Sequence, residues 1–236
     1  MNVILGKYNQ LEVVKEVDFG VYLDGGDDGE ILLPSRYVPE GCKPGDVLNV
    51  FIYLDNEERL IATTLQPKVQ VGEFACLEVA WINEYGAFLD WGLMKDLFVP
   101  FREQKMKMQK GRSYVVHAHV DEESYRIMAS AKVERYLSKE KPDYQPGQEV
   151  EIMIWQRTDL GYKAIVENQY SGLILAHGHC GGVAVQNTHG IHNGVRQHDH
   201  AQNSHGDQGD FDAQADLVLV VALCGVRHNF DPSLLL

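Results

Sequence analysis

The chain has 236 residues, of which 44% are hydrophobic and 23% are charged, so it can form one large globular domain or two to three small ones. A formal net charge of -13 disfavours non-specific attraction to nucleic acid or to anionic membranes, and any phosphate contact must therefore be local. Four widely spaced cysteines and the lack of an early apolar stretch indicate reduced thiols in the cytoplasm. The longest late apolar run, Leu217 to Val226, is about half as long as a membrane span, so no transmembrane segment is expected.

Two stretches of the chain repeat each other at an offset of 66 residues. The motif "FGVYLDGG" begins at Phe19 and "YGAFLDWG" begins at Tyr85, and both follow an aromatic-Gly-x-aromatic-Leu-Asp pattern. The segments "PGDVLNVFIYLDNEERLIATT" and "KGRSYVVHAHVDEESYRIMAS" match at the same offset. Alternating apolar residues between Gly, Asp and Asn turn signals predict short strands. Such strands in a small module favour a barrel, because closure removes exposed strand edges.

A weaker third copy, "PGQEVEIMIWQRTDLGYKAIVENQYSGLI", places Gly161 and Tyr162 where the other copies have an aromatic-Gly pair. Before it, the segment Ala131 to Glu140 predicts a short linking helix. The barrel pattern stops after Ile174, with two strands still missing. We therefore expect an all-β protein with barrels at 1–66 and 67–140, an incomplete third barrel at 141–174, and an irregular or disordered tail at 175–236.

The strand order and the turn element, Asp-x-x-x-x-Arg-Ile in the second copy and the one-residue-shorter Asp-x-x-x-Arg-Leu in the first, resemble the S1 RNA-binding repeat, a five-stranded oligonucleotide-binding (OB) barrel. The tandem copies, with "LLP" and "FVP" in the third strand, are similar to the conserved virulence factor B family, in which S1-like barrels precede a winged helix. The resemblance covers about residues 1 to 174 and implies RNA binding in post-transcriptional control of gene expression. No winged helix is visible, so we infer no DNA-binding role. The S1 motif commonly has a histidine on the third strand, where Leu33 and Val99 stand in this chain.

A single-stranded RNA site needs aromatic faces for base stacking and cations near the backbone. The candidate rings are Phe19 and Tyr22 in the first copy and Tyr85 and Phe88 in the second. Phe19 and Tyr22 are three residues apart, so strand alternation alone would not place them on one face, and we expect a bulge at Gly20 to bring them together. The same rings would also suit a structural role in the core or over a barrel edge.

The candidate cations are Arg59, Arg126 and the members of a basic segment, Phe101 to Arg112. This segment carries five cations and one anion, Glu103, for a local charge of +4. It suits contact with a phosphate backbone, and it also suits an ordinary solvated loop. The acidic turn "GGDDGE" in the first copy should repel phosphate instead. The five cations of the basic segment are Arg102, Lys105, Lys107, Lys110 and Arg112.

The composition changes abruptly near Gly172, and seven of the ten histidines lie between His177 and Asp210. One explanation is a metal-binding segment around His198, although its spacing fits no standard tetrahedral scheme and we expect no metal or other cofactor. A second is a disordered linker. A third is a shifted reading frame, which would explain a change in the middle of a motif. In that case another frame of the coding DNA after codon 174 should restore strands and a helical C-terminal domain.

The leading functional hypothesis is a cytoplasmic RNA-binding regulator that contacts single-stranded RNA through its tandem barrels and is not an enzyme. No catalytic triad, H-E-x-x-H, Walker loop or G-x-G-x-x-G arrangement supports an enzyme. Asp24 and Asp90 recur at one repeat position, where we expect them to cap turns. The alternative is a protein-interaction or scaffold module without direct RNA binding.

Overall fold

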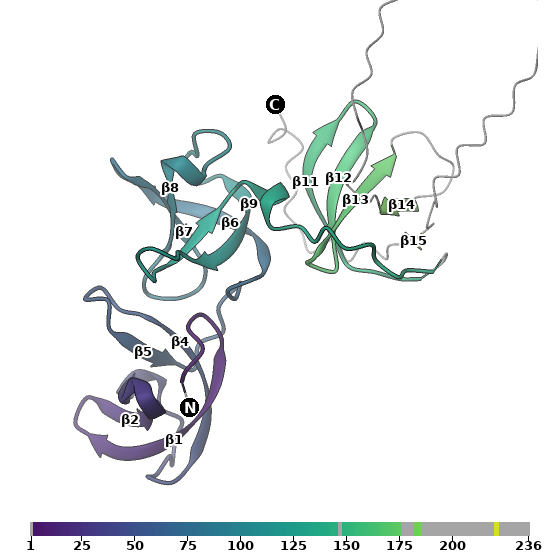
Figure 1. Ribbon diagram of the computed structural model, residues 1–236. Coiled ribbons are helices and arrows are strands. Elements are labelled where there is room, and N and C mark those ends of the chain that lie inside the picture. The colour runs from purple at the N-terminus through teal and green to yellow at the C-terminus, as the bar shows by residue number, and fades with distance from the viewer. Residues whose placement is uncertain (1, 146–147, 176–181, 186–219, 222–236) are drawn as a thin grey trace, which may run out of the picture. The chain divides into compact units, whose positions relative to one another are not determined.

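The computed structural model describes residues 2–145, 148–175, 182–185 and 220–221, and it is built from β-strands, as predicted (Figure 1). The chain divides into two compact units, Met1–Tyr136 and Leu137–Leu236, which are described separately. Within the described residues, no helix is long and apolar enough to cross a membrane. Most of the His-rich tail, and with it the metal, linker and reading-frame hypotheses, falls outside the described residues.

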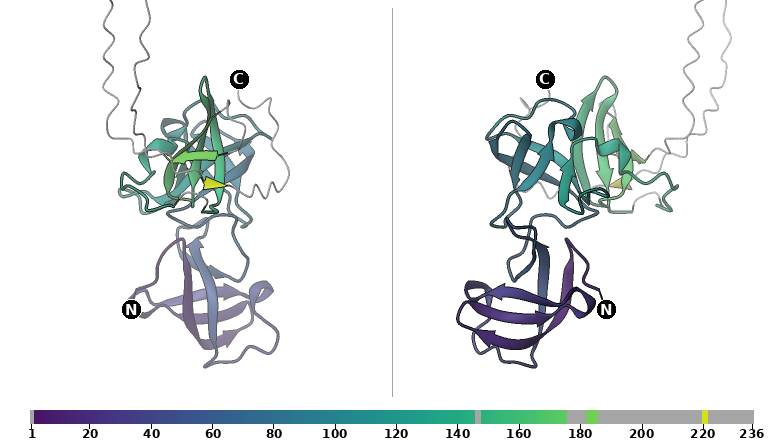
Figure 2. Two further views of the ribbon diagram at one scale, coloured as in Figure 1. Left: turned by 90° about the vertical axis from the view of Figure 1, so that its right-hand side faces the viewer. Right: turned by 60° about the vertical axis from the view of Figure 1, so that its left-hand side comes forward.

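Barrel 1 is a closed barrel of five strands in the order β1-β2-β3-β5-β4 (Figure 2). Adjacent strands are antiparallel except β3 and β5, which run parallel and pair at Leu32 and Ile61. Its core holds eight buried apolar side chains, among them Leu23, Leu33 and Ile52. The strands are β1 (Tyr8–Val17), β2 (Gly20–Asp24), β3 (Glu30–Pro34), β4 (Val47–Leu54) and β5 (Leu60–Thr63), with short 3-10 turns at η1 (Gly26–Asp28) and η2 (Ser35–Tyr37).

Barrel 2 repeats this topology, with the strand order β10-β8-β7-β6-β9. The pairing of Phe88 with Phe98 corresponds to that of Tyr22 with Leu32, so the 66-residue sequence offset is also a structural offset. The strands are β6 (Phe74–Ile82), β7 (Gly86–Asp90), β8 (Leu97–Pro100), β9 (Ser113–Val120) and β10 (Ile127–Ser130), with 3-10 turns at η3 (Phe101–Glu103) and η4 (Val133–Arg135).

Strand β4 joins the two barrels because both of its faces are buried. Val50 and Ile52 point into the core of barrel 1, whereas Phe51 and Tyr53 belong to a larger apolar cluster with barrel 2 residues. The Phe51 ring meets the edge of Trp91 at a centroid distance of 5.8 Å. The unbroken apolar run "VFIYL" in β4 is the sequence signature of a strand buried on both sides.

The predicted linking helix over Ala131 to Glu140 is wrong, because only the single turn η4 forms. The Ala131 N–H donates to the Glu103 carbonyl at 2.9 Å, and the Val133 side chain is buried. Further on, the Ser138 N–H donates to the Gln169 carbonyl at 2.8 Å. With these backbone partners, the segment forms one 3-10 turn and bends in place of an i to i+4 helical ladder.

The second unit contains a five-stranded sheet in the order β11-β12-β13-β14-β15. The prediction of an incomplete third barrel is confirmed, since the sheet is not a closed barrel in the part of the chain that the structure describes. Strand β14 lies where no strand was predicted, and it pairs with β13 through Gly172 and Val185. Strand β15 lies within the late apolar run, whose residues predict a strand or a short helix. The strands are β11 (Ile152–Thr158), β12 (Gly161–Val166), β13 (Tyr170–Leu175), β14 (Gly182–Val185) and β15 (Val220–Val221).

Candidate nucleic-acid interface

Three aromatic side chains lie side by side across the outside of barrel 2. Trp81 on β6 pairs with Phe88 on β7, which pairs with Phe98 on β8. The Trp81 and Phe88 rings are parallel, with centroids 3.7 Å apart and an interplanar angle of 3°, and Phe98 follows at 4.9 Å. A β-bulge between Val79 and Trp81 sets this register. We call Trp81, Phe88 and Phe98 the aromatic row.

The aromatic row is accessible to a ligand. Trp81 is 42% exposed, and Phe88 and Phe98 are half-buried. Beside the row, Tyr85 is 65% exposed and Phe101 is 41% exposed, and the Phe101 N–H donates to the Tyr85 carbonyl at 3.2 Å. The parallel contact between Trp81 and Phe88 covers one face of each ring, so the exposed part of Trp81 at the end of the row is the π-surface on which an unpaired base can stack.

Gly86 is required for the aromatic row to form. A Cβ atom at this position would lie 2.9 Å from the Phe98 ring and 2.3 Å from the Val99 carbonyl oxygen. The glycine therefore lets β8 approach β7 closely and lets the Phe98 ring lie over the backbone.

The equivalent face of barrel 1 is different, although the sequence repeat treats the two as alike. Lys15, Tyr22 and Leu32 take the places of the aromatic row. The Lys15 ammonium lies 4.8 Å from the centre of the Tyr22 ring and forms an ion pair with Glu30. Tyr22 is thus covered by an internal cation, and barrel 1 offers a poorer stacking surface.

Phe19 and Tyr22 do come together, but the predicted bulge at Gly20 is wrong. Their ring centroids are 6.3 Å apart in an edge-on arrangement, and Phe19 is 55% exposed. Phe19 precedes β2, so the alternation of side chains along that strand does not fix the direction of its ring. The bulge lies instead on β1, between Val13 and Lys15. Gly20 has another role, because a Cβ there would lie 2.1 Å from the Leu33 carbonyl oxygen.

Most of the predicted cations are occupied by carboxylates. Arg59 pairs with Asp55 and Glu57, and Arg126 pairs with Glu58 across the junction between the barrels. Within the basic segment, Arg102 pairs with Asp121 at 3.4 Å and Lys105 with Glu134 at 2.9 Å.

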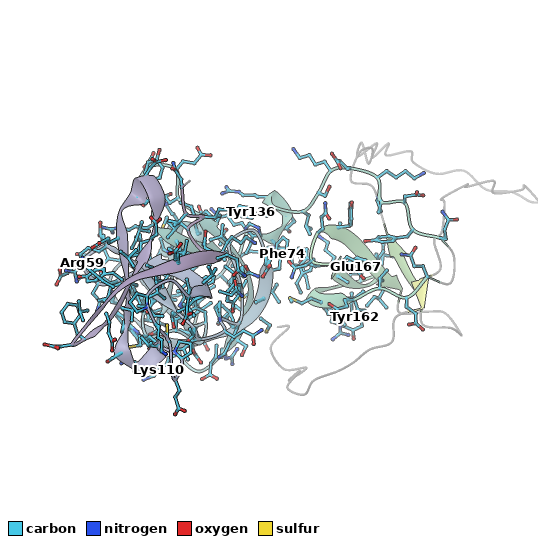
Figure 3. All side chains as sticks on the ribbon, turned by 90° about the horizontal axis from the view of Figure 1, so that it is seen from below. Arg59, Phe74, Lys110, Tyr136, Tyr162 and Glu167 are labelled. Atoms are coloured by element: carbon cyan, nitrogen blue, oxygen red, sulfur yellow. The ribbon has the colours of Figure 1, made fainter. Side chains whose placement is uncertain are left out.

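The other three cations of the basic segment, Lys107, Lys110 and Arg112, are exposed and form no ion pair with another described residue. Arg59 and Lys110 lie at separate edges of the first unit (Figure 3). The predicted cations therefore do not form a single patch.

The recurring aspartates cap turns, as predicted. Asp24 accepts a hydrogen bond from the Gly26 N–H at 2.8 Å, and Asp90 accepts one from the Gly92 N–H at 2.9 Å. A hydrogen bond from Lys68, together with that of Gly92, lowers the pKa of Asp90. The carboxylate is therefore held ionised for a structural role.

The outer face of β9 carries a buried histidine that the sequence did not single out. His117 stacks on Tyr136 with centroids 4.0 Å apart, its ring centroid lies 4.7 Å from that of Phe74, and it is only 8% exposed. Burial, followed by the charge of His119, lowers the pKa of His117 to about 4. Each of these residues has a counterpart in barrel 1, 66 positions earlier. Phe74 corresponds to Tyr8, His117 to Phe51 and His119 to Tyr53.

Sequence reasoning missed Trp81 and Phe98, which complete the aromatic row. Trp81 lies outside the repeated aromatic-Gly motif, and its counterpart in barrel 1 is Lys15, so the repeat does not single it out. A usable signal was available in the strand pattern "LEVAWI", whose tryptophan falls on the solvent side once the bulge is recognised.

The two closed five-stranded barrels of the first unit have an OB-like architecture. Residues 5–65 match the S1 domain family. The chain is 37% identical over 95 residues to the uncharacterized protein YitL of Bacillus subtilis (strain 168), a match that spans 40% of this chain and 32% of that protein. A solved structure of a multidomain protein with nucleic acid binding domains from Streptococcus pneumoniae TIGR4 is 21% identical to this chain, with a TM-score of 0.48. The match covers 77% of this chain and 67% of that protein. The resemblance to the conserved virulence factor B family stays a prediction.

Proposed function

We propose that this protein is an RNA-binding regulator that contacts single-stranded RNA mainly through barrel 2 and catalyses no reaction. The observation that carries the proposal is the parallel, partly exposed stack of Trp81 and Phe88 on rigid strands. Each base stacked on an aromatic side chain contributes about 1–3 kcal/mol to binding. The S1 domain match supports nucleic acid as the ligand, and RNA is the ligand expected of that domain.

Under this proposal the phosphate backbone is contacted by the unpaired cations of the basic segment: Lys107, Lys110 and Arg112. The net charge of -13 repels RNA at long range, so binding depends on stacking more than on charge. Phe19, Tyr22, Arg59 and Arg126 contribute less, because a cation covers Tyr22 and carboxylates hold both arginines. We assign the regulator to the cytoplasm and to post-transcriptional control.

The test is fluorescence anisotropy with short labelled single-stranded RNA at low salt. The Trp81→Ala/Phe88→Ala variant should lose at least tenfold in affinity, since it removes the exposed Trp81 ring and the Phe88 ring that supports it. Tyr22→Ala, at the position of barrel 1 that corresponds to Phe88, is the matched control and should change affinity less than threefold. Absence of RNA binding by the unmodified chain at low salt would refute the proposal.

A second candidate function, protein interaction, is favoured by the acidic end of barrel 1. Asp27 and Asp28 in η1 and Glu30 at the start of β3 lie close together in the chain on exposed positions. Such a surface suits a basic protein partner. Co-purification of a defined protein that survives nuclease treatment and is lost on charge reversal at these positions would support this function.

A further inference from the structure

A crevice of about 510 Å³ lies where barrel 1 meets barrel 2 inside the first unit. One wall is the β4–β5 hairpin of barrel 1, which contributes Asn56 and Glu58. The opposite wall belongs to barrel 2 and includes Phe88 and Phe98, two of the three members of the aromatic row. The crevice is therefore continuous with the surface on which we place RNA, and its volume falls in the range of small-molecule sites.

The two walls are fixed to each other by several contacts. The Lys95 ammonium donates to the Asp55 carbonyl at 2.6 Å, and Arg126 forms its ion pair with Glu58. Phe51 and Trp91 pack beneath them. A ligand would thus enter a largely formed site, with little loss of conformational entropy on binding.

Asp96 provides the polar group that can distinguish between bases. It lines the crevice at the start of β8, and Trp81 Nε1 donates to its Oδ2 at 2.7 Å. Its other oxygen, Oδ1, accepts no hydrogen bond from the residues that the structure describes. A carboxylate oxygen is an acceptor only, so it pairs with a base amino group and is repelled by a base carbonyl.

We propose that the crevice receives one unstacked base of the bound RNA, and that Asp96 favours a base with an exocyclic amino group, such as adenine or cytosine, over uracil, which has none. The neighbouring base would stack on the exposed side of the aromatic row. Barrel 1 then acts as the second wall of a composite site in barrel 2 and does not bind RNA independently. This inference rests on the proposed RNA-binding function.

The test compares binding of labelled oligo(A), oligo(C) and oligo(U) of equal length to the full chain at one salt concentration. The unmodified chain should bind oligo(A) and oligo(C) about tenfold more tightly than oligo(U), the discrimination expected of a directed base contact. In Asp96→Asn the amide oxygen can keep the Trp81 hydrogen bond while the NH₂ group faces the crevice. This variant should lose the preference or reverse it.

The matched control is Glu30→Gln, which changes the carboxylate of barrel 1 that corresponds to Asp96 and that pairs with Lys15 outside the crevice. It should leave the base preference unchanged. Asn56→Trp, an exposed position on the hairpin, fills the crevice and should weaken oligo(A) binding while leaving the aromatic row intact. It also provides a second measurement should Asp96→Asn fold poorly.

The possible results separate the two proposals. If the unmodified chain binds all three oligonucleotides and the aromatic-row variant does not, but Asp96→Asn keeps the base preference and Asn56→Trp does not weaken oligo(A) binding, the crevice inference is wrong and the proposed function stands. If the unmodified chain binds none of the three at low salt, both are wrong.

Discussion

The stacked histidine of barrel 2 should make the first unit sensitive to acid, and His117→Phe should remove that sensitivity. Burial lowers the pKa of His117 from 6.5 to about 4. Above pH 6.5 the ring is neutral in both folded and unfolded chains, so it adds no pH dependence. As the pH falls from 6.5 towards 4, the unfolded chain takes up a proton that the folded chain cannot, and stability is lost.

The size of the loss follows from the two pKa values. At 1.36 kcal/mol per pKa unit, His117 costs about 2 kcal/mol at pH 5 and about 3 kcal/mol once the pH is well below 4. Phenylalanine occupies the corresponding position, Phe51, in barrel 1, where it packs against Tyr8 with centroids 5.6 Å apart. His117→Phe should therefore fit between Phe74 and Tyr136 and abolish this part of the loss.

The assay is urea unfolding of the full chain at about pH 7.5 and about pH 5. Between these pH values, His117 should lower the free energy of unfolding by roughly 2 kcal/mol. A Trp155→Phe background would leave Trp81 and Trp91 to report on barrel 2. The difference in stability between the two pH values should be about 2 kcal/mol smaller in His117→Phe than in the unmodified chain. His119→Phe, on the same strand face, should keep most of the loss because the buried His117 ring remains. Equal losses in His117→Phe and the unmodified chain would refute the reasoning.

Three further predictions concern the junction, the strand packing and the charges. Phe51→Ala should lower the free energy of unfolding by about 3–5 kcal/mol, as measured by urea denaturation, because it leaves a cavity shared by both barrels. A smaller loss than about 1 kcal/mol would mean that the junction is not tightly packed. Gly86→Ala should reduce both thermal stability and RNA affinity, because its Cβ would lie 2.3 Å from the Val99 carbonyl oxygen, and unchanged values for both would contradict that geometry. A plot of the logarithm of the RNA association constant against the logarithm of the salt concentration should have a slope of about -2, because each of the three unpaired cations of the basic segment contributes about -0.7. A slope steeper than about -4 would mean that the ion-paired cations also contact phosphate.

The fold was predictable because the barrel repeats. Apolar alternation between turn residues predicted the strands, the small size of each repeat favoured a barrel, and the resemblance to the S1 repeat implied five strands. The double burial of β4 was also visible in principle, since "VFIYL" leaves no polar face for solvent. The predicted linking helix does not form because the N–H groups of Ala131 and Ser138 donate to carbonyls of residues far away in the sequence. The side-chain pattern of the segment does not reveal these partners.

The candidate site was predictable only in part. The repeat found Phe88 and Tyr85, but it concealed Trp81, whose counterpart is a lysine. It also made Tyr22 look equivalent to Phe88, although Lys15 covers one ring and Trp81 extends the stack of the other. Such differences depend on which residue of the neighbouring strand pairs with the ring. That neighbour is set by the β-bulge and the strand register, which the sequence repeat does not specify.

The partners of the cations were hidden for a related reason. Arg126 meets Glu58 in the other barrel, 68 positions away, and Lys105 meets Glu134, 29 positions away. A count of charges within one segment could not reveal these neighbours, and it overstated the positive charge free to contact phosphate.

Ultraviolet cross-linking of the full chain to single-stranded RNA, followed by mapping of the modified peptides, would locate the bound bases most directly. We expect adducts in the strands that carry Trp81, Phe88 and Phe98, with few in the strands around Tyr22. Adducts confined to barrel 1 or to the second unit, with none on the aromatic row, would contradict the assignment of RNA binding to barrel 2.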